Sequence, residues 1–219
     1  MKPLFVEGQQ FARSGVLFIV SGPSGAGKTS MSGAALDSFP ELELSRSVTT
    51  RSPRGGECDG DQYNFISRNE FIALRDCDGL AEWAEVHSNF YGTPREPIER
   101  AMEQGRDLLL DIDVQGASQI KALYGDAAVA IFLLPPDRKT LENRLRGRAT
   151  DDAETVALRL RAACREIASL GAYDYVIVNN DLEDAKSEFR AVLRAERRRV
   201  ARLRSPELAK LIAVFQEDL

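Results

Sequence analysis

Short apolar runs alternate with longer amphipathic stretches along most of the chain. Four runs have the length and aliphatic composition of buried strands, and they lie at 16–20, 108–113, 129–134 and 175–178. The remaining pattern predicts helices at 28–39, 94–104, 137–147, 152–169 and 181–204. Strands that are apolar throughout and separated by helices are typical of a parallel sheet covered on both faces. The pattern therefore predicts an α/β core.

The stretch 47–93 interrupts this alternation. It is rich in Ser, Thr, Arg, Gly and Asp, and it contains only short alternating pieces such as Tyr-Asn-Phe-Ile-Ser at 63–67. Such pieces, bounded by turn-forming residues, are typical of short half-buried strands. We expect a small β-rich subdomain to be inserted into the core here.

The C-terminal part of the chain is rich in arginine, with seven arginines between 190 and 204. Apolar residues recur at helical spacing opposite them, at Phe189, Val192, Leu193, Val200 and Leu203. This spacing favours a solvated arginine face, and binding of a nucleic acid or another anionic partner is the alternative. Ser205, Pro206 and Glu207 then suit the first positions of a further helix.

Composition and charge narrow the function classes. The 219 residues can bury a sizeable core, and no apolar run approaches the roughly 18 residues of a membrane span. The N-terminal segment lacks the apolar centre of a secretory signal. Three separated cysteines and a single histidine, His87, predict a cytoplasmic protein with reduced thiols rather than a Cys/His metal site. Because the net charge is −5, we expect anions to be held by local clusters, with no nucleic acid or membrane as partner.

The most specific local signal is the segment Gly-Pro-Ser-Gly-Ala-Gly-Lys-Thr at 22–29. It fits the pattern G-x-x-x-x-G-K-[ST], directly after a predicted strand and at the start of a predicted helix. Glycines let backbone N–H groups turn toward phosphate oxygens, and the helix adds its positive end. Lys28 is expected to reach the β- and γ-phosphates, and the Thr29 hydroxyl to ligate Mg²⁺. The motif predicts a triphosphate site formed by Gly22, Pro23, Ser24, Gly25, Ala26, Gly27, Lys28 and Thr29.

The inserted stretch carries a second candidate site. Arg51, Arg54 and Tyr63 are grouped around a Gly-rich turn, and two guanidinium groups with a phenol suit a phosphate monoester. A carboxylate, a second phenol and a hydroxyl follow at Glu82, Tyr91 and Thr93. From these residues alone, ordinary solvated surface groups remain the simpler interpretation.

Several ordered segments resemble the guanylate kinase family. They are S-V-T-T-R-S-P-R-x-G-E, Y-N-F, E-W-A-E-V, Y-G-T-P, D-I-D-x-Q-G, R-L-x-G-R and Y-D-Y-V-I-V-N. The resemblance covers about 15–197, nearly the whole chain. It implies a P-loop core at 15–46, 95–136 and 169–204, a GMP-binding insertion at 47–94, a helical lid at 137–168, and a C-terminal helical extension at 198–219.

The resemblance implies that GMP is held by Ser47, Arg51, Arg54, Tyr63, Glu82, Tyr91, Thr93 and Asp113. The chemistry agrees, because guanine presents the donors N1–H and N2–H₂ beside the acceptor O6. A carboxylate at Glu82 can accept from both donors, while Ser47 and Thr93 can donate to O6. The arginines and tyrosines would hold the phosphate, and Asp113 would accept from the 2-amino group or a water. Such a site can discriminate against the wrong base by up to ~10⁴–10⁵.

The reaction that the resemblance implies is transfer of the γ-phosphoryl group of MgATP to GMP, and also to dGMP. The acceptor phosphate has a second pKa of about 6, so no general base is needed. Lys28, Mg²⁺ and the lid arginines Arg144, Arg148 and Arg159 would neutralise charge on the passing group. Arg144 and Arg148 share a face if their helix extends that far. Beyond Mg²⁺ with ATP, no tightly bound organic cofactor is expected.

Two aspartates follow the apolar run that begins at 108. Two residues apart on a predicted strand, Asp111 and Asp113 would share one face near the ligand crevice. We assign Asp111 to the water shell of Mg²⁺ and Asp113 to guanine.

Three positions depart from the family pattern, namely Gln62, Ala149 and Asn180. Asn180 follows Asn179, which is assigned to ATP, so the adenine contacts are less defined. Two alternatives remain, an inactive guanylate-kinase-like module that binds proteins, and a kinase for another phosphorylated acceptor. The intact phosphate loop and lid arginines favour an enzyme. The sequence leaves a homo-oligomer possible, and for His87 it favours packing.

Overall fold

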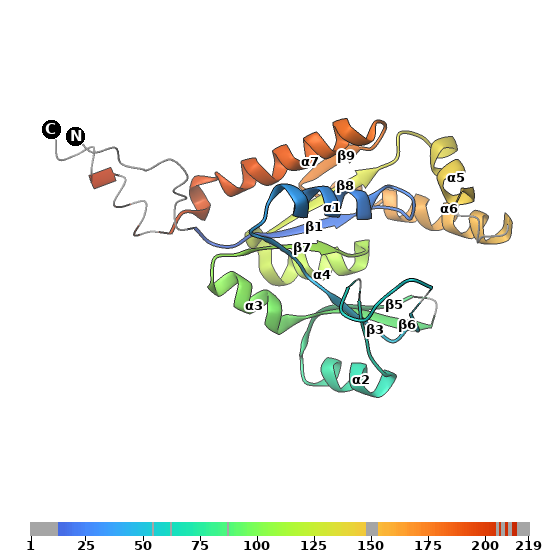
Figure 1. The fold of residues 1–219 in the computed structure, drawn as a ribbon, viewed down its shortest axis with the longest axis horizontal. Helices are drawn as coiled ribbons and strands as arrows, with labels where there is room; N and C mark the ends of the chain where they lie inside the picture. Colours follow the sequence, from blue (N-terminus) through green and yellow to red (C-terminus); the bar gives the residue numbers. More distant parts are fainter. Residues whose placement is uncertain are drawn as a thin grey trace.

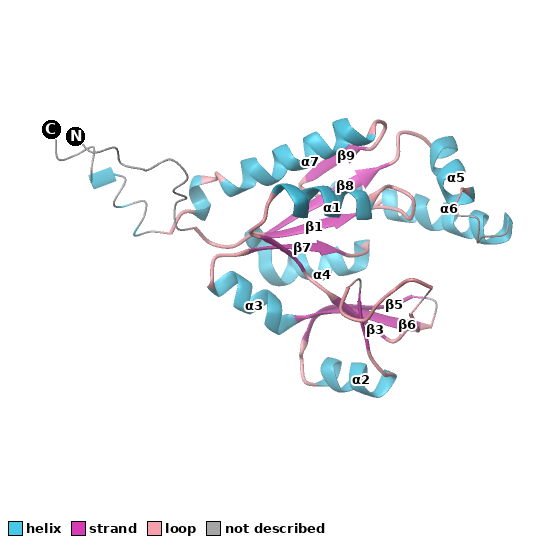
Figure 2. Cartoon of the chain, in the orientation of Figure 1, coloured by secondary structure: helices cyan, strands magenta, loops and turns pink. Residues whose placement is uncertain are grey.

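The computed structural model describes residues 13–53, 55–61, 63–86, 88–147 and 153–204, together with residues 206, 209, 212 and 213. This part of the chain consists of two sheets, the helices that pack on them, and a further pair of helices at one end (Figures 1 and 2). Within it, no helix is long and apolar enough to cross a membrane.

A five-stranded parallel sheet forms the core, in the order β2-β7-β1-β8-β9. Its strands are β1 (Leu17–Ser21), β2 (Leu42–Leu44), β7 (Asp107–Asp111), β8 (Ala128–Leu134) and β9 (Tyr175–Val178). The central strand β1 is buried along its whole length. This explains its unbroken apolar run, because helices cover both faces of the sheet.

Alternate residues of β1 contact the two helical layers. Phe18 and Val20 belong to the apolar cluster that includes α1 (Lys28–Ser38) and α7 (Leu182–Arg197). Leu17 and Ile19 belong to the cluster on the other face, with α3 (Arg95–Glu103) and α4 (Val114–Tyr124). Figure 1 shows these two layers above and below the core sheet. Short 3₁₀ turns connect or follow the helices, at η1 (Gly125–Ala127), η2 (Leu170–Ala172) and η3 (Val200–Arg202).

The inserted stretch forms a separate four-stranded sheet, in the order β4-β3-β6-β5. Its strands are β3 (Ser47–Thr49), β4 (Tyr63–Phe65), β5 (Leu80–Val86) and β6 (Asn89–Pro94). A helix, α2 (Arg68–Asp76), packs on the sheet through Phe71, which is fully buried in a cluster with Val48, Leu80 and Phe90. A capping box between Ser67 and Glu70 starts this helix. The β-rich prediction is confirmed, and the helix is an addition to it.

The helices α5 (Arg138–Arg146) and α6 (Ala153–Ile167) form a pair at one end of the molecule (Figure 1). They share a small apolar cluster of their own, made of Leu141, Leu145, Val156, Leu160 and Ala163. Asp137 starts α5 by accepting a hydrogen bond from the Thr140 N–H group.

The four predicted strands and five predicted helices all form, with some changes at their ends. The sequence missed the short strand β2 and the helix α4. One residue-level prediction is wrong: β7 ends at Asp111, and Asp113 is the N-cap of α4. The two aspartates therefore do not share a strand face, because the chain turns between them.

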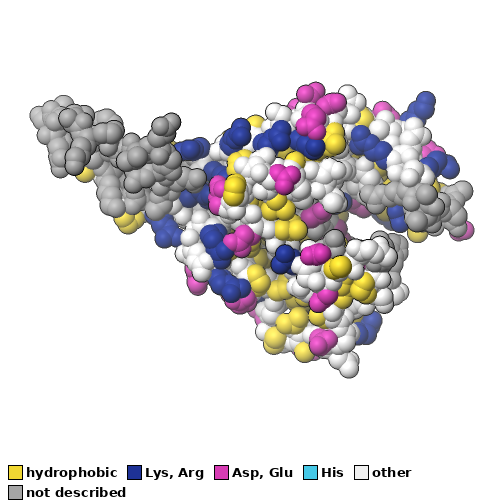
Figure 3. All heavy atoms as spheres, in the orientation of Figure 1, with side chains coloured by type: hydrophobic (Ala, Val, Ile, Leu, Met, Phe, Trp, Pro, Cys, Tyr) yellow, Lys and Arg dark blue, Asp and Glu magenta, His cyan; other side chains and the backbone are white. Residues whose placement is uncertain are grey.

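The arginine-rich C-terminal segment also differs from its prediction. The helix α7 ends at Arg197, and Val200, predicted to be on the apolar face, is 65% exposed. Arg197 and Arg202 are not solvated, since their side chains are only 9% and 7% exposed. Arg202 donates to the buried Glu196 at 2.6 Å. Figure 3 shows that other basic side chains do lie on the surface over α7.

Asp107, at the start of β7, organises the end of the sheet that lies away from the phosphate loop. It is fully buried and accepts hydrogen bonds from both terminal nitrogens of Arg13 at 2.6 Å, and from Arg197 Nε at 2.6 Å. It also accepts from the Val16 N–H group at 2.9 Å. A buried carboxylate with several charged donors is costly to remove, because its partners would then be buried without compensation.

We predict that Asp107→Asn lowers the free energy of unfolding by roughly 3 kcal/mol, measured by urea denaturation. The matched control is Asp78→Asn, because Asp78 pairs with Arg95 while its side chain is 85% exposed. That change should cost less than about 1 kcal/mol. Equal effects of the two substitutions would contradict a structural role for the buried network.

Candidate active site

The loop between β1 and α1 takes the form expected of a phosphate-binding loop. Gly27 precedes α1 with a φ of 102°, which favours glycine. A β-carbon at Gly27 would also lie 2.3 Å from Nδ2 of Asn179, so the position has no room for a side chain. No side chain among the described residues caps α1, and its first turn holds no acid. The N-terminal N–H groups of α1 therefore suit an anion.

Lys28 lies across this loop. Its ammonium group donates to the Gly22 carbonyl oxygen at 2.7 Å. Lys28 also lies close enough to the Asp111 carboxylate to affect its pKa. Burial raises the pKa of Asp111, and the positive charge of Lys28 partly opposes that rise. Thr29, the next residue of α1, is exposed.

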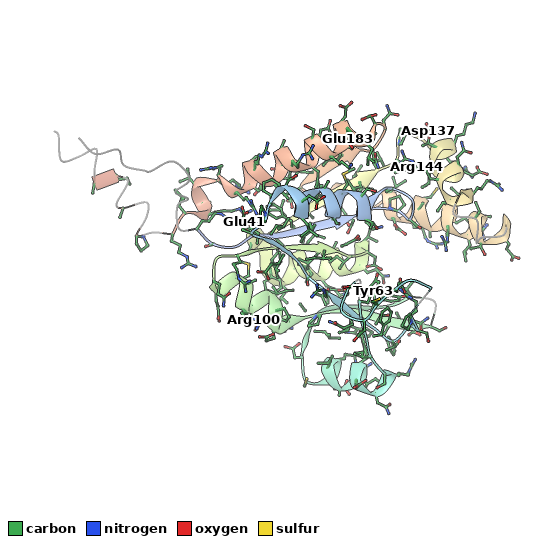
Figure 4. All side chains as sticks on the ribbon, in the orientation of Figure 1. Glu41, Tyr63, Arg100, Asp137, Arg144 and Glu183 are labelled. Carbon is green, nitrogen blue, oxygen red and sulfur yellow. The ribbon has the colours of Figure 1, made fainter. Side chains whose placement is uncertain are left out.

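Asn179 ties the end of β9 to the loop. Its Nδ2 donates to the Ala26 carbonyl oxygen at 2.7 Å, and its side chain is almost fully buried. The Asn179 carbonyl oxygen accepts from Arg144 of α5 at 2.9 Å. Figure 4 shows Arg144 on the helix pair beside the core. One residue thus contacts both the phosphate loop and an arginine predicted to be catalytic.

A group of cationic and phenolic side chains lies on the small sheet. Arg51 makes a bidentate ion pair with Glu57, at 2.7 and 2.9 Å. The hydrogen bond to this carboxylate is the main reason why the pKa of Arg51 is raised. The Arg51 guanidinium also lies 5.4 Å from the ring centre of Tyr63, whose ring is 5.9 Å from that of Tyr91.

Tyr63 faces the core sheet. Burial raises the pKa of its hydroxyl, and the negative charge of Asp111 on β7 adds to the rise. Figure 4 places Tyr63 on the side of the small sheet that faces the core. The arginine and tyrosine group on the small sheet is therefore opposite the end of the phosphate loop, where Lys28 and Asp111 lie.

Glu82 is a carboxylate held in a nearly closed site, with 5% exposure. Its Oε1 accepts a 2.5 Å hydrogen bond from the fully buried Thr93 hydroxyl, which lies 3.5 Å from the Ser47 hydroxyl. Burial raises the pKa of Glu82 from 4.5 to about 7; the hydrogen bond from Thr93 lowers it, and the charge of Asp113 raises it further. Within the described chain, no cation forms an ion pair with Glu82.

Asp113 is a second carboxylate close to Glu82. Its Oδ1 accepts from the N–H groups of Gln115 and Gly116, at 3.0 and 2.9 Å, and so caps α4. A carboxylate at a helix N-terminus is favourable because of the helix dipole. The carboxylates of Asp113 and Glu82 thus approach each other at the junction of the core and the small sheet.

The structure brings most of the predicted residues together in two groups. The first comprises the phosphate loop at 22–29 with Asp111, Asn179 and Arg144. The second comprises Ser47, Arg51, Tyr63, Glu82, Tyr91, Thr93 and Asp113.

The other predicted residues are Arg159 and several that the structure does not describe. Arg159 is half-buried on α6. Arg54, Gln62, His87, Arg148 and Ala149 lie outside the described residues. The helix α5 ends at Arg146, so the condition for a helical face shared by Arg144 and Arg148 is not met.

Sequence reasoning missed three contributors. Glu57, Gly116 and Gln119 all contact site residues or the strand that carries them. Glu57 and Gly116 lie in the segments R-S-P-R-G-G-E and D-I-D-V-Q-G, so a signal was present. Gln119 lies on α4, the helix that the hydrophobic pattern did not predict.

A phosphate loop at the end of a parallel strand, opposite a separate sheet that carries an arginine, two tyrosines and a buried carboxylate, defines a P-loop nucleotide kinase. The chain belongs to the guanylate kinase family, whose model matches residues 14–196.

Relatives and a solved structure agree with this assignment. The chain is 47% identical to the guanylate kinase of Rhizobium meliloti over 212 residues, covering 97% of this chain and 96% of the relative. It is 49% identical to the guanylate kinase of Syntrophotalea carbinolica over 206 residues, covering 94% and 97%. The crystal structure of guanylate kinase from Anaplasma phagocytophilum matches with a TM-score of 0.75 at 35% identity, covering 88% of this chain and 92% of that one.

The burial of Glu82 has a consequence for stability. Because its folded pKa is about 7 and its ordinary value is 4.5, the folded protein binds the proton more tightly than the unfolded chain. Stability is therefore lost as the pH rises from about 4.5 through about 7. Glu82→Gln removes this effect. We predict that, between pH 5 and pH 8, its free energy of unfolding rises by about 2–3 kcal/mol relative to that of the wild type.

The measurement is urea unfolding of the ligand-free protein at the two pH values. The control is Glu85→Gln, at an exposed carboxyl on the same strand. If Glu82→Gln and Glu85→Gln respond to pH alike, the carboxyl of Glu82 is not strained by burial.

Proposed function

We propose that this chain transfers the γ-phosphoryl group of ATP to GMP or dGMP, giving ADP and GDP or dGDP. The single observation that carries the choice of acceptor is the buried Glu82 carboxylate beside the Thr93 hydroxyl. Membership of the guanylate kinase family agrees with it.

Guanine recognition follows from hydrogen-bonding chemistry. The carboxylate of Glu82 accepts from N1–H and the 2-amino group, and the Ser47 hydroxyl donates to O6. The Thr93 hydroxyl, also predicted to donate to O6, donates its one proton to Glu82 and so holds the carboxylate. Asp113 adds an acceptor near the 2-amino group. Adenine would place a lone pair against the carboxylate and an amino group against the hydroxyls. Buried polar groups left unpaired in this way account for strong rejection of the wrong base.

The GMP phosphate is bound by Arg51, Tyr63 and Tyr91, with Arg54 assigned by family resemblance. The Arg51 guanidinium donates two hydrogen bonds to the Glu57 carboxylate. A phosphate dianion offers the same bidentate geometry with more charge, so it can take over one or both of these hydrogen bonds. The tyrosine hydroxyls then donate to the remaining phosphate oxygens.

ATP is bound at the phosphate loop. The N–H groups of the loop and of the first turn of α1 surround the β-phosphate, and Lys28 turns from the Gly22 carbonyl oxygen to the β- and γ-phosphates. Asn179 holds the loop from the adenine side. Arg144 leaves the Asn179 carbonyl oxygen to reach the transferring group, together with Arg148 and Arg159.

Mg²⁺ accompanies ATP, and the residues present fit it. Thr29 lies in the first turn of α1, next to Lys28, and Asp111 ends β7 close to the same lysine. The described residues contain no group of three or more metal-binding side chains. Such a sparse set of ligands suits Mg²⁺, which usually takes one or two protein oxygens and completes its shell with phosphates and water. The ion supplies neutralisation of phosphate charge.

No general base is required of the protein. The GMP phosphate, with a second pKa of about 6, is largely a dianion at pH 7 and attacks directly. The task left to the side chains is alignment of the two phosphates and exclusion of water.

The units proposed for these tasks are the insertion at 47–94, which binds GMP, and the helix pair at 137–168, which acts as a lid over a core at 15–46, 95–136 and 169–204. The extension at 198–219 follows the guanylate-kinase-like domain at 15–197. The three free cysteines support a cytoplasmic location. Nucleotides are the expected partners, rather than nucleic acid or membrane, and assembly into a homo-oligomer stays open.

The acceptor assignment predicts a sharp preference in a coupled assay with ATP. GMP and dGMP should be phosphorylated, and kcat/KM for AMP, CMP and UMP should be at least about 10³-fold lower. ATP hydrolysis without acceptor should be slow, since the lid arginines reach the transferring group only in the closed complex. Equal use of AMP and GMP would refute the proposal.

The lid assignment predicts a selective loss of rate in Arg144→Ala. We expect kcat to fall roughly 10²-fold, because a charge-stabilising donor is lost, while KM for GMP changes little. The control is Arg146→Ala, on the same helix, where the side chain is 55% exposed and pairs only with Glu142 among the described residues. A kcat of Arg144→Ala within twofold of the control would exclude a catalytic role for Arg144.

A further inference from the structure

The helix α4 of the core meets the strand β5 of the small sheet at Glu82 and Trp83. β5 is an edge strand, so its outer backbone groups have no neighbouring strand. Gln119 of α4 forms hydrogen bonds with the backbone N–H and carbonyl groups of Trp83. Its Oε1 accepts from the Trp83 N–H group at 3.2 Å, and its Nε2 donates to the Trp83 carbonyl oxygen at 2.9 Å. The Gln119 amide therefore fixes the backbone next to Glu82.

Gly116 lies one turn earlier on the same face of α4. A β-carbon at Gly116 would lie 2.6 Å from Oε2 of Glu82 and 3.0 Å from its carboxyl carbon. The second oxygen of the carboxylate thus rests against bare helix backbone, while Thr93 holds the first oxygen at 2.5 Å. The register of β5 also shifts between Leu80 and Glu82, an irregularity of the kind that redirects side chains near active sites.

We propose that Gly116 and Gln119 are positioning residues that set the specificity for guanine by fixing the Glu82 carboxylate. This inference rests on the proposed function. A contact under 3.0 Å cannot persist, and here the group able to move is the end of the Glu82 side chain. Any side chain at Gly116 would therefore displace the two oxygens that guanine needs. Loss of Gln119 would release the strand that carries them.

Displacement of Glu82 has a distinctive effect on specificity. GMP donates from both N1 and the 2-amino group, so it needs both carboxylate oxygens in place. IMP lacks the 2-amino group and needs only one. A displaced carboxylate can keep one hydrogen bond to the base but not two parallel ones. The value of kcat/KM therefore falls more for GMP than for IMP. The ratio of kcat/KM for GMP to kcat/KM for IMP therefore reports the position of Glu82. A general loss of stability would not change this ratio.

The test compares this ratio in the wild type, Gly116→Ala and Gln119→Ala. We expect it to fall about tenfold in Gly116→Ala and several-fold in Gln119→Ala, with KM for ATP unchanged. Two matched controls should keep the wild-type ratio. Gly33→Ala adds a methyl group on α1 with no atom within 4 Å, and Ser118→Ala alters an exposed neighbour on α4.

A double-mutant cycle with Glu82→Gln tests whether the two residues act through Glu82. In the Glu82→Gln background, Gly116→Ala and Gln119→Ala should change the GMP to IMP ratio less than twofold. The same loss in both backgrounds would overturn the inference, as would single variants with the wild-type ratio. If Gly116→Ala does not fold, Gln119→Ala decides alone. A wild type that does not prefer GMP to IMP would instead contradict the proposed function.

Discussion

The small sheet is arranged around a buried carboxylate. Glu82 is 5% exposed, receives one hydrogen bond from Thr93, and has a pKa raised to about 7 by burial. Water, the usual partner of a carboxylate, is mostly excluded, so burial destabilises the ionised form. In the proposed function, guanine supplies two N–H donors to this carboxylate, whereas adenine supplies none in the same place. The energetic cost of burying Glu82 would thus become selectivity for the correct base.

Three described cations of the site show the opposite arrangement, because each of them has an internal partner. Arg51 is paired with Glu57, Lys28 donates to the Gly22 carbonyl oxygen, and Arg144 donates to the Asn179 carbonyl oxygen. These partners keep the positive groups in place at modest cost, and phosphate oxygens with higher charge can displace them. These hydrogen bonds hold the donor groups near the positions proposed for phosphate binding.

The core strands and the phosphate loop were predictable because their signals are local, as in the apolar run of β1 and the glycines at 22–27. α4 was missed because only Ile112 and its N-cap Asp113 separate it from β7. The prediction of a solvated arginine face was wrong at Arg197 and Arg202. Their partners, Asp107 and Glu196, are set by tertiary contacts. The burial of Glu82 likewise depends on α4 packing against β5, and family resemblance alone pointed to its role.

The most direct test of the central claim is to count the protons released when GMP binds at pH 7, by calorimetry in buffers of different ionisation enthalpy. If Glu82 has a pKa of about 7 and binds guanine as a carboxylate, the wild type releases roughly half a proton more than Glu82→Gln. The phosphate of GMP contributes equally to both proteins and cancels. Equal proton release by the two proteins would show that Glu82 is already ionised, or that it does not contact the base.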